Sequence, residues 1–310
     1  MEIRRRDLAP DLFEPIEVGA RESERMAGPP IGFWKDSWRR LKKNRGAFVS
    51  LIIIVVLLLM AFVIGPLLSQ YSPYAQDLGR RFVAPSSGAW FGTDGFGRDM
   101  WTRVWAGTQV SLFIAFLAAL LDLTVGVAYG AVSGFVGGWV DEVMQRVIEI
   151  LVGIPALVVA ILAMTIFSPG IITISIAIGL TGWVTMARIV RGKMMQLKEQ
   201  EFALASRSLG AGGFRLVRRH LLPNSLGPII VNLMFTIPLA IFAEAFLSFI
   251  GLGIQVPDAS LGSLISDGAE QIRFYPYLLF IPSAVFCLIM LSFNLLGDGL
   301  RDAFDPKMRR

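Results

Sequence analysis

The chain has 310 residues, of which 54% are hydrophobic and 17% charged, and its mean hydropathy is +0.61. This composition is too apolar for an ordinary soluble domain and is typical of a membrane protein. A single histidine and a single cysteine exclude an intrachain disulfide and a Cys/His metal cluster, and we expect no metal site. The net charge of +5 is explained by a membrane surface and needs no nucleic acid.

The amino-terminal region is predicted to lie outside the bilayer. Residues 1–30 are rich in charge and proline and lack hydrophobic periodicity, which predicts a disordered cytoplasmic tail. In the segment 31–46, Trp34, Trp38 and Leu41 lie on one face at helical spacing, and lysines and arginines fill the other positions. This pattern predicts an amphipathic elbow helix on the inner leaflet.

Residues 47–68 form the plainest candidate membrane span. The run AFVSLIIIVVLLLMAFVIGPLL carries no charge, and a helix of this length rises about 33 Å, enough for a hydrocarbon core of about 30 Å. The alternative is a cleaved signal peptide, but its apolar region is about 7–15 residues long and lies near the start of a chain. The pattern favours an uncleaved signal anchor.

Residues 69–107 are predicted to be an external loop with a short interfacial helix. Asp94 precedes a glycine in a turn, and Asp99 is expected to cap a short helix in which Trp101 and Trp105 lie one turn apart. The aromatic residues suit an anchor at the membrane interface. Together with Arg98 they also suit a docking surface for an external partner, and the sequence leaves both interpretations open.

Five further apolar stretches follow, each long enough to cross a bilayer. With the first span they predict six transmembrane helices and an all-α integral membrane fold, in which residues 108–300 form a five-helix core. The five spans are predicted over residues 108–132, 147–167, 171–190, 226–250 and 277–299. Prolines that invite kinks lie within three of them: Pro155, Pro238 and Pro282.

The distribution of positive charge predicts the orientation of these spans. Of the 29 Lys and Arg residues, 24 lie in segments on one side of the predicted membrane and 5 lie on the other. Because cytoplasmic loops carry the excess of positive charge, both termini, with the tail 301–310, are predicted to be cytoplasmic. The polar segment 199–222 is predicted to lie on the same side.

Three carboxylates fall inside the predicted spans: Asp122, Glu149 and Glu244. Each costs about 2.5–3.5 kcal/mol at the centre of a membrane helix, so we do not expect them to face lipid. Glu149 lies three residues after Arg146 and is expected to pair with it. Asp122 and Glu244 lie deeper, where they either pair structurally or line a transport pathway.

The segment 199–222 has the pattern of two short amphipathic elements. Phe202, Ala205, Ser206 and Leu209 follow the i, i+3, i+4, i+7 spacing, which predicts a helix over 199–209 that ends at Gly210. A helix this short is marginal alone in water. It is therefore expected to lie on lipid or in a groove of a cytoplasmic partner.

A second short stripe follows the glycines. Phe214, Val217 and Leu221 mark its apolar positions, and arginines line it. Pro223 is predicted to close it, so that Asn224 or Ser225 caps the next span. The arginines are Arg215, Arg218 and Arg219.

This segment resembles the EAA loop of binding-protein-dependent ABC importer permeases, which reads E-A-A, three residues, G, nine residues, a hydrophobic residue, one residue and L-P. Leu204-Ala205-Ser206, Gly210 and Leu222-Pro223 fall on that spacing. Leu204 stands where the motif has Glu, and His220 occupies the hydrophobic position. Glu201, one turn earlier, is a possible substitute for the missing acid.

The resemblance narrows with FGTDGFGRDMWTRVWAGTQVSL (91–112), EAFLSFIGLGIQVPDASLG (244–262) and NLLGDGLRDAFDPKMRR (294–310). These stretches are similar to C-type permease subunits of oligopeptide and dipeptide importers, and the match covers about residues 33–310. It implies a type I importer permease with one extra amino-terminal span, in a bacterial cell membrane. The implied partners are a homologous B-type permease, two cytoplasmic ATPase subunits, an external peptide-binding protein and the peptide.

The resemblance also implies that the chain is not an enzyme and holds no cofactor. ATP and Mg would be bound by the ATPase subunits, and the sequence contains no phosphate-binding G-x-x-x-x-G-K-[ST] motif. The residues implied in coupling to the ATPase are Glu201, Phe202, Ala205, Ser206, Leu209, Gly210, Arg215, Arg218 and Pro223.

Two other functions stay open at this point. Close relatives of such permeases handle nickel and other small solutes. An ion-coupled secondary transporter would also use carboxylates within its spans, but it should show inverted repeats with broken helices, and we find no internal repeat.

Overall fold

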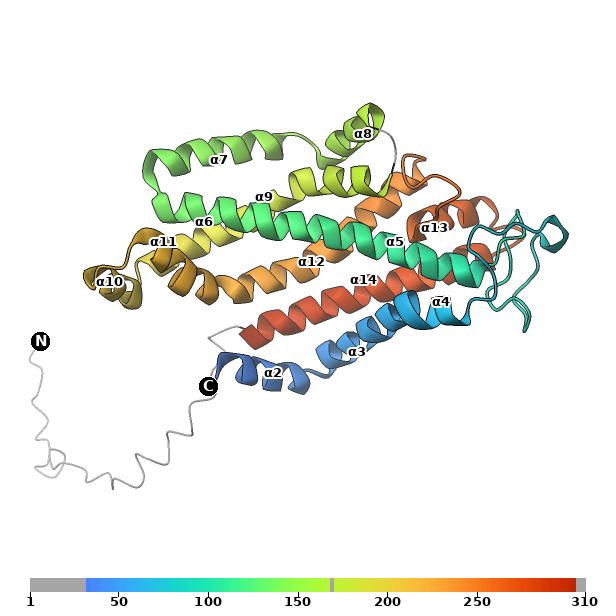
Figure 1. The fold of residues 1–310 in the computed structure, drawn as a ribbon, viewed down its shortest axis with the longest axis horizontal. Helices are drawn as coiled ribbons and strands as arrows, with labels where there is room; N and C mark the ends of the chain where they lie inside the picture. Colours follow the sequence, from blue (N-terminus) through green and yellow to red (C-terminus); the bar gives the residue numbers. More distant parts are fainter. Residues whose placement is uncertain (1–31, 168–169, 305–310) are drawn as a thin grey trace, which may run out of the picture.

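The computed structural model describes residues 32–167 and 170–304. The predicted tail 1–30 and the end of the predicted tail 301–310 lie outside these residues. The described chain is an elongated bundle of helices (Figure 1). One end of the bundle carries the short helices between the fourth and fifth spans, and we call it the α10 end. The opposite end carries the long loop 69–99, and we call it the loop end.

The helices run in chain order as follows: α2 (Phe33–Lys43), α3 (Arg45–Leu59), α4 (Gly65–Leu68), α5 (Met100–Leu121), α6 (Val127–Val136), α7 (Gly138–Gly153), α8 (Ala156–Ile166), α9 (Ile171–Lys198), α10 (Glu201–Ser208), α11 (Gly213–Leu216), α12 (Leu222–Phe249), α13 (Leu261–Glu270) and α14 (Tyr277–Phe304). Three π-helical segments join neighbouring helices into longer rods: Met60–Ile64, Asp122–Gly126 and Val217–Leu221.

Five of these rods are long and apolar enough to cross a membrane, or six if the bent pair α7 and α8 counts as one span. The five are Arg45–Leu68, Met100–Val136, Ile171–Lys198, Gly213–Phe249 and Tyr277–Phe304. The all-α architecture predicted from the sequence is therefore the one observed, with five or six candidate spans.

The predicted third span, residues 147–167, is not one straight helix. The chain bends by 79° between α7 and α8, and the break falls at Ile154, which is extended, and Pro155. Proline disfavours the helical conformation of the preceding residue and lacks the N–H needed to continue the hydrogen-bond ladder. The kink expected at Pro155 is therefore a complete break.

Two predicted helix boundaries are also wrong. Asp99 does cap a helix, but that helix is the 37-residue rod Met100–Val136 rather than a short interfacial helix, because nothing between Met100 and Leu121 stops it. Pro223 does not end a helix either, since α11, the π-helical segment and α12 are continuous. A π-helical turn already interrupts the regular ladder, so the missing N–H of Pro223 is tolerated beside it.

The rod Met100–Val136 packs closely against α9 through glycines spaced four residues apart: Gly126, Gly130 and Gly134. A Cβ atom on Gly134 would lie 2.5 Å from the carbonyl oxygen of Arg191, and one on Gly126 would lie 2.7 Å from the Cβ of Met186. Glycine is therefore required for this approach of the two backbones. Because α9 leads directly into α10, this packing positions the candidate functional segment.

Candidate functional site

The helix α10 stands out from the bundle at the α10 end (Figure 1). Ala203 alone faces inward among its residues and is fully buried. Leu209 is 89% exposed, and Phe202 and Leu204 are also exposed. The predicted stripe of Phe202, Ala205, Ser206 and Leu209 therefore does not pack on this chain. It is available to another molecule or to lipid.

The end of α10 is a glycine-capped turn. Gly210 has φ +83°, which an L side chain rarely adopts. The N–H of Ala211 donates to the carbonyl of Ser206 (3.0 Å), and the N–H of Gly210 donates to that of Arg207 (2.9 Å). These two bonds satisfy carbonyls at the helix end and hold Leu209 outward at the apex of the turn.

The second element presents a basic and aromatic surface. Phe214 is 79% exposed, while Leu216 and Leu221 are fully buried. The predicted stripe is confirmed for Leu221 and for Val217, which packs against the core, but not for Phe214. Leu216 takes the inward position instead, because the π-helical segment places residues five apart on one face. A hollow of about 380 Å³ is lined by Phe214 and three arginines, Arg215, Arg218 and Arg219.

A polar clamp holds the base of this segment. The guanidinium of Arg191 on α9 donates two hydrogen bonds of 2.6 Å to the carboxylate of Asp141 on α7. Ser133 on α6 donates to the same carboxylate, and Lys198, at the end of α9, donates to the carbonyl of Gly134 (3.0 Å). A bidentate pair of this kind fixes both distance and orientation. Three helices are therefore tied together beside α10.

Glu244 on α12 has no exposed surface. It accepts hydrogen bonds from Ser111 on α5 (3.0 Å) and from Ser248 on its own helix (2.8 Å). The hydroxyl oxygen of Ser111 in turn accepts the N–H of Leu261 at the start of α13. Glu244 thus occupies a structural junction inside this chain rather than an open surface.

Asp122 begins the π-helical segment of the second rod and is 1% exposed. Its Oδ2 atom accepts hydrogen bonds from Thr236 (2.6 Å) and Asn232 (3.3 Å), both on α12. Its Oδ1 atom is buried without a hydrogen-bond partner among the described residues. Glu149 differs from both buried acids, because it is exposed on α7 and pairs with Arg146 at 2.7 Å, as the sequence spacing predicts.

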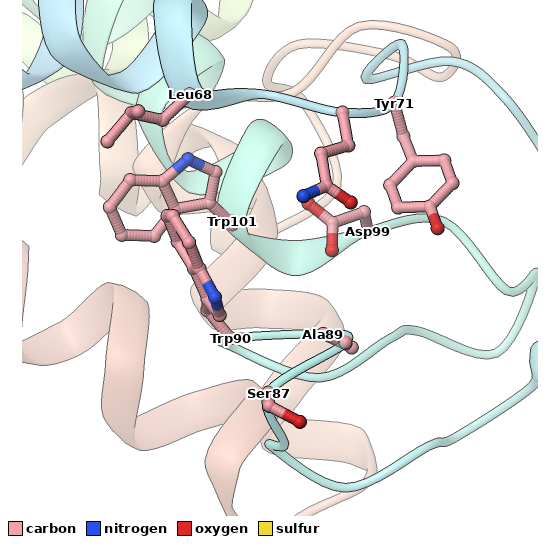
Figure 2. A pocket seen from close by; sticks show the side chains of 9 residues that line it. Leu68, Tyr71, Ser87, Ala89, Trp90, Asp99 and Trp101 are labelled. Atoms are coloured by element: carbon pink, nitrogen blue, oxygen red, sulfur yellow. The ribbon is translucent and has the colours of Figure 1, made fainter.

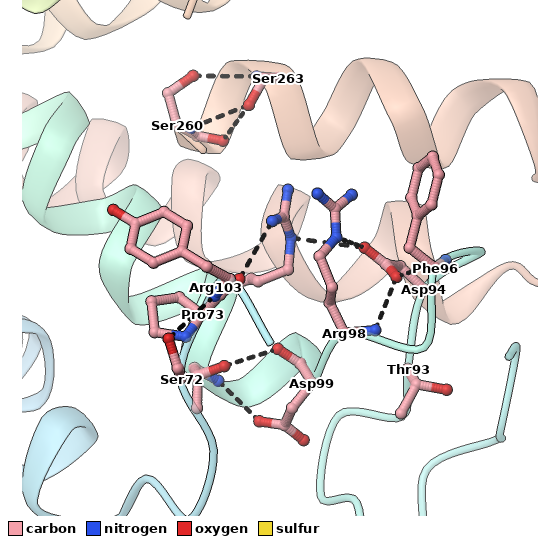
Figure 3. Close-up of polar contacts among 12 residues, drawn as sticks. Ser72, Pro73, Thr93, Asp94, Phe96, Arg98, Asp99, Arg103, Ser260 and Ser263 are labelled. Atoms are coloured by element: carbon pink, nitrogen blue, oxygen red, sulfur yellow. Dashed lines mark hydrogen bonds and ion pairs between the residues drawn. The ribbon is translucent and has the colours of Figure 1, made fainter. Parts of the chain in front are cut away.

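The charged residues singled out near the loop end are packed inside it (Figure 3). Asp94 binds Arg98 at 2.6 Å and lies 3.6 Å from Arg103. Asp99 accepts the N–H of Thr102 at 2.9 Å. Asp94, Arg98 and Asp99 are all buried, so they do not themselves form the exposed docking surface that the sequence suggested.

The two tryptophans of this region are also largely covered. Trp101 packs edge-on against Trp90 and Trp105, and its ring nitrogen donates to the carbonyl of Gly65 (3.3 Å). Trp105 is buried. Figure 2 shows Trp90 and Trp101 beside Leu68 in a hollow of only about 20 Å³, which is too small for a peptide.

A much larger groove of about 910 Å³ lies between α2, α9, α12 and α14. Apolar side chains of α12 line it together with Asn232, and Lys193 and Arg301 contribute positive charge. The sequence did not single out Asn232, Asp141 and Arg191. Asn232 is one polar residue in an apolar run, and the other two stand among further charged residues, so no spacing marks them as partners. Among residues 32–167 and 170–304, no group of three His, Cys, Asp or Glu side chains is placed to hold a metal ion.

These features define a class: a multi-pass helical membrane protein with an exposed helical segment between two of its long rods. A family model described as the inner membrane component of binding-protein-dependent transport systems matches residues 126–310. A second model, the N-terminal transmembrane domain of oligopeptide transport permease C, matches residues 32–85. The chain belongs to the family of binding-protein-dependent transport system inner membrane components.

Similar proteins cover nearly the whole chain. It is 45% identical over 300 residues to the oligopeptide transport system permease protein OppC of Bacillus subtilis, covering 97% of this chain and 98% of the relative. It is 50% identical over 291 residues to the dipeptide transport system permease protein DppC of the same organism, covering 94% and 91%. OppC of Salmonella typhimurium is 43% identical over 289 residues, covering 93% and 95%.

The fold is also similar to a solved structure. A chain of the MetNI methionine ABC transporter in an inward-facing conformation matches with a TM-score of 0.54 and 17% identity, covering 66% of this chain and 97% of that chain. At this identity the likeness concerns the fold alone. It agrees with the type I importer permease fold implied by the sequence motifs.

Proposed function

We propose that this chain is the C-type permease subunit of an ATP-driven importer of short peptides in a bacterial cell membrane. Permeases named for oligopeptide and dipeptide transport match over more than nine tenths of the chain and support this substrate class. The partners are a B-type permease that completes the pore, two ATPase subunits that bind ATP and Mg, and an external peptide-binding protein. The chain itself carries out no bond chemistry.

One observation supports coupling to an ATPase: α10 and its capped turn expose apolar side chains while their base is fixed. Leu209 and Phe214 have few contacts within this chain, and burial of such side chains in a partner's groove contributes about 1.5–3 kcal/mol each. Closure of the ATPase dimer would move α10, and the rods α9 and α12 on either side would move with it. The α10 end is then cytoplasmic, in agreement with the charge distribution.

The substitution Leu209→Asp tests this proposal. Leu209 is 89% exposed, so an aspartate there is not expected to unfold the permease. It places a charge where the ATPase groove must be apolar. We expect the assembled permease pair to stay in the membrane, the ATPase to be lost on co-purification, and peptide uptake to fall at least about tenfold.

The matched control is Phe274→Asp, since Phe274 is 77% exposed and lies near the loop end, away from α10. It should retain the ATPase. Full ATPase binding and uptake in Leu209→Asp would show that α10 is not the coupling element. Identification of the ligand that co-purifies with the whole assembly separates a peptide from nickel or another solute.

A further inference from the structure

Of the residues implied in coupling to the ATPase, only Pro223 lines the groove between α2, α9, α12 and α14. Its α12 wall is mainly apolar, with Val231 and Phe235 on either side of Asn232. Lys193 and Arg301 line it as well, and they come from the ends of α9 and α14 nearer α10. The groove is therefore positively charged toward the α10 end, with an isolated amide further along α12.

The orientation of the Asn232 amide is determined by its neighbours. Its nitrogen lies 3.3 Å from Oδ2 of Asp122 and 3.5 Å from the hydroxyl oxygen of Thr236. The Thr236 hydroxyl donates its own proton to Asp122, so both neighbours accept from Asn232. The nitrogen must therefore point toward Asp122, and the carboxamide oxygen points to the other side.

That oxygen has no hydrogen-bond partner among the described residues, while Asn232 itself lines the groove. The carboxylate of Asp122, on the other side of the amide, favours a positively charged hydrogen-bond donor at this oxygen. Asp122 is 1% exposed, its Oδ1 atom has no hydrogen-bond partner, and no described Lys or Arg nitrogen lies within 4 Å of it. A carboxylate removed from water acts over a longer range than an exposed one.

We propose that Asn232, oriented by Asp122 and Thr236, binds the α-ammonium group of the transported peptide as it crosses the membrane. The inference rests on the proposed peptide import function and deepens it. Asn232 lies nine residues along α12 from Pro223, which is about 14 Å in a helix. An extended peptide of about four residues spans that length of α12, and its carboxylate would lie toward the α10 end, where Lys193 and Arg301 line the groove.

Photo-crosslinking identifies the occupant of the groove. Phe235, which lines it one turn from Asn232, is replaced by the photoreactive residue p-benzoylphenylalanine in the full complex. During turnover we expect a labelled tetrapeptide to be captured, and about tenfold less capture when Asn232→Leu is added. Capture of the second permease or of lipid instead of peptide would overturn the assignment.

Uptake measurements then test the chemistry. The uptake rate of a tetrapeptide with a free amine is compared with that of its N-acetylated form, each at a concentration that saturates the binding protein. The ratio of the two rates in each variant is divided by the ratio in the wild type. Asn232→Leu should lower the preference for the free amine about tenfold. Asn224→Leu is the control, because Asn224 lines the same groove but its amide donates to the His220 carbonyl. This substitution should leave the preference for the free amine unchanged.

The double variant Asp122→Asn with Asn232→Asp exchanges the two side chains, so that the amide at position 122 donates to a carboxylate at position 232. It should restore the preference for the free amine, which the single variant Asp122→Asn should lose. A normal preference in Asn232→Leu refutes the inference and leaves peptide import intact. Absence of uptake of any peptide by the wild-type complex refutes the proposed function itself. If the binding protein rejects the acetylated peptide, the crosslinking comparison decides.

Discussion

Glu244 is a carboxylate with no exposed surface in an apolar helix. Its two oxygens accept the hydroxyl protons of Ser111 and Ser248, and Ser111 also accepts the N–H of Leu261. The resulting chain of hydrogen bonds connects α5, α12 and α13. Networks of this kind stabilise a bundle only while every member keeps its partner.

We predict that Glu244→Leu lowers the thermal stability of the purified complex more than Glu244→Gln does. Leucine leaves the hydroxyls of Ser111 and Ser248 without this partner, at about 1–3 kcal/mol for each buried group, whereas glutamine keeps one acceptor. Uptake should fall in proportion to the amount of assembled complex. Normal assembly with lost uptake would instead place Glu244 on the transport pathway.

At the scale of elements, the pairing of α6 with α9 determines how α10 is held. Glycines let the two backbones meet, and the Asp141–Arg191 pair adds α7 at the end next to α10. In the proposed mechanism, a displacement of α10 would be passed to three helices that are tied together rather than to α9 alone. The π-helical segment Val217–Leu221 lies on the other side of α10, where the chain enters α12.

Gly134→Ala is predicted to disturb this group. The added Cβ would lie 2.5 Å from the Arg191 carbonyl oxygen and 2.8 Å from the Met194 Cβ, and overpacking of this kind typically costs about 1–3 kcal/mol. We expect a lower melting temperature and less peptide imported per ATP hydrolysed. Gly192→Ala is the control, because its Cβ would meet nothing within 4 Å. Equal behaviour of the two variants would contradict a tight contact between α6 and α9.

At the scale of the whole molecule, the two ends of the bundle differ in character. The α10 end carries exposed apolar residues among arginines. At the loop end, Asp94, Arg98 and Arg103 form a buried charged network. An ATPase on one side and a binding protein on the other require such a polarity. The distribution of positive charge predicts that the α10 end is cytoplasmic.

Cysteine labelling checks this orientation. In a Cys287→Ser background, Leu209→Cys and Phe274→Cys each place one thiol at a position that is 89% and 77% exposed, respectively. A membrane-impermeant maleimide added to intact cells should label only the Phe274→Cys protein. After the membrane is permeabilised, it should label both proteins. Labelling of only Leu209→Cys in intact cells would reverse the orientation.

Sequence patterns alone were sufficient to predict the class of this protein. Uncharged runs of about 20 residues can bury their backbone only as membrane helices, and the spacing of Ala205, Gly210 and Pro223 pointed to an importer permease. Local chemistry also predicted the Asp99 cap and the Arg146–Glu149 pair, because these depend on residues three apart in one helix.

Contacts between side chains that are distant in the sequence became visible only in the folded chain. The inward position of Leu216 and the burial of Asp94 depend on packing between helices, which periodicity does not encode. Asn232 and Asp122 are 110 positions apart along the chain, yet they are in hydrogen-bond contact across two rods. A hydrogen bond is directional and short in range, so only the folded chain could identify this pair.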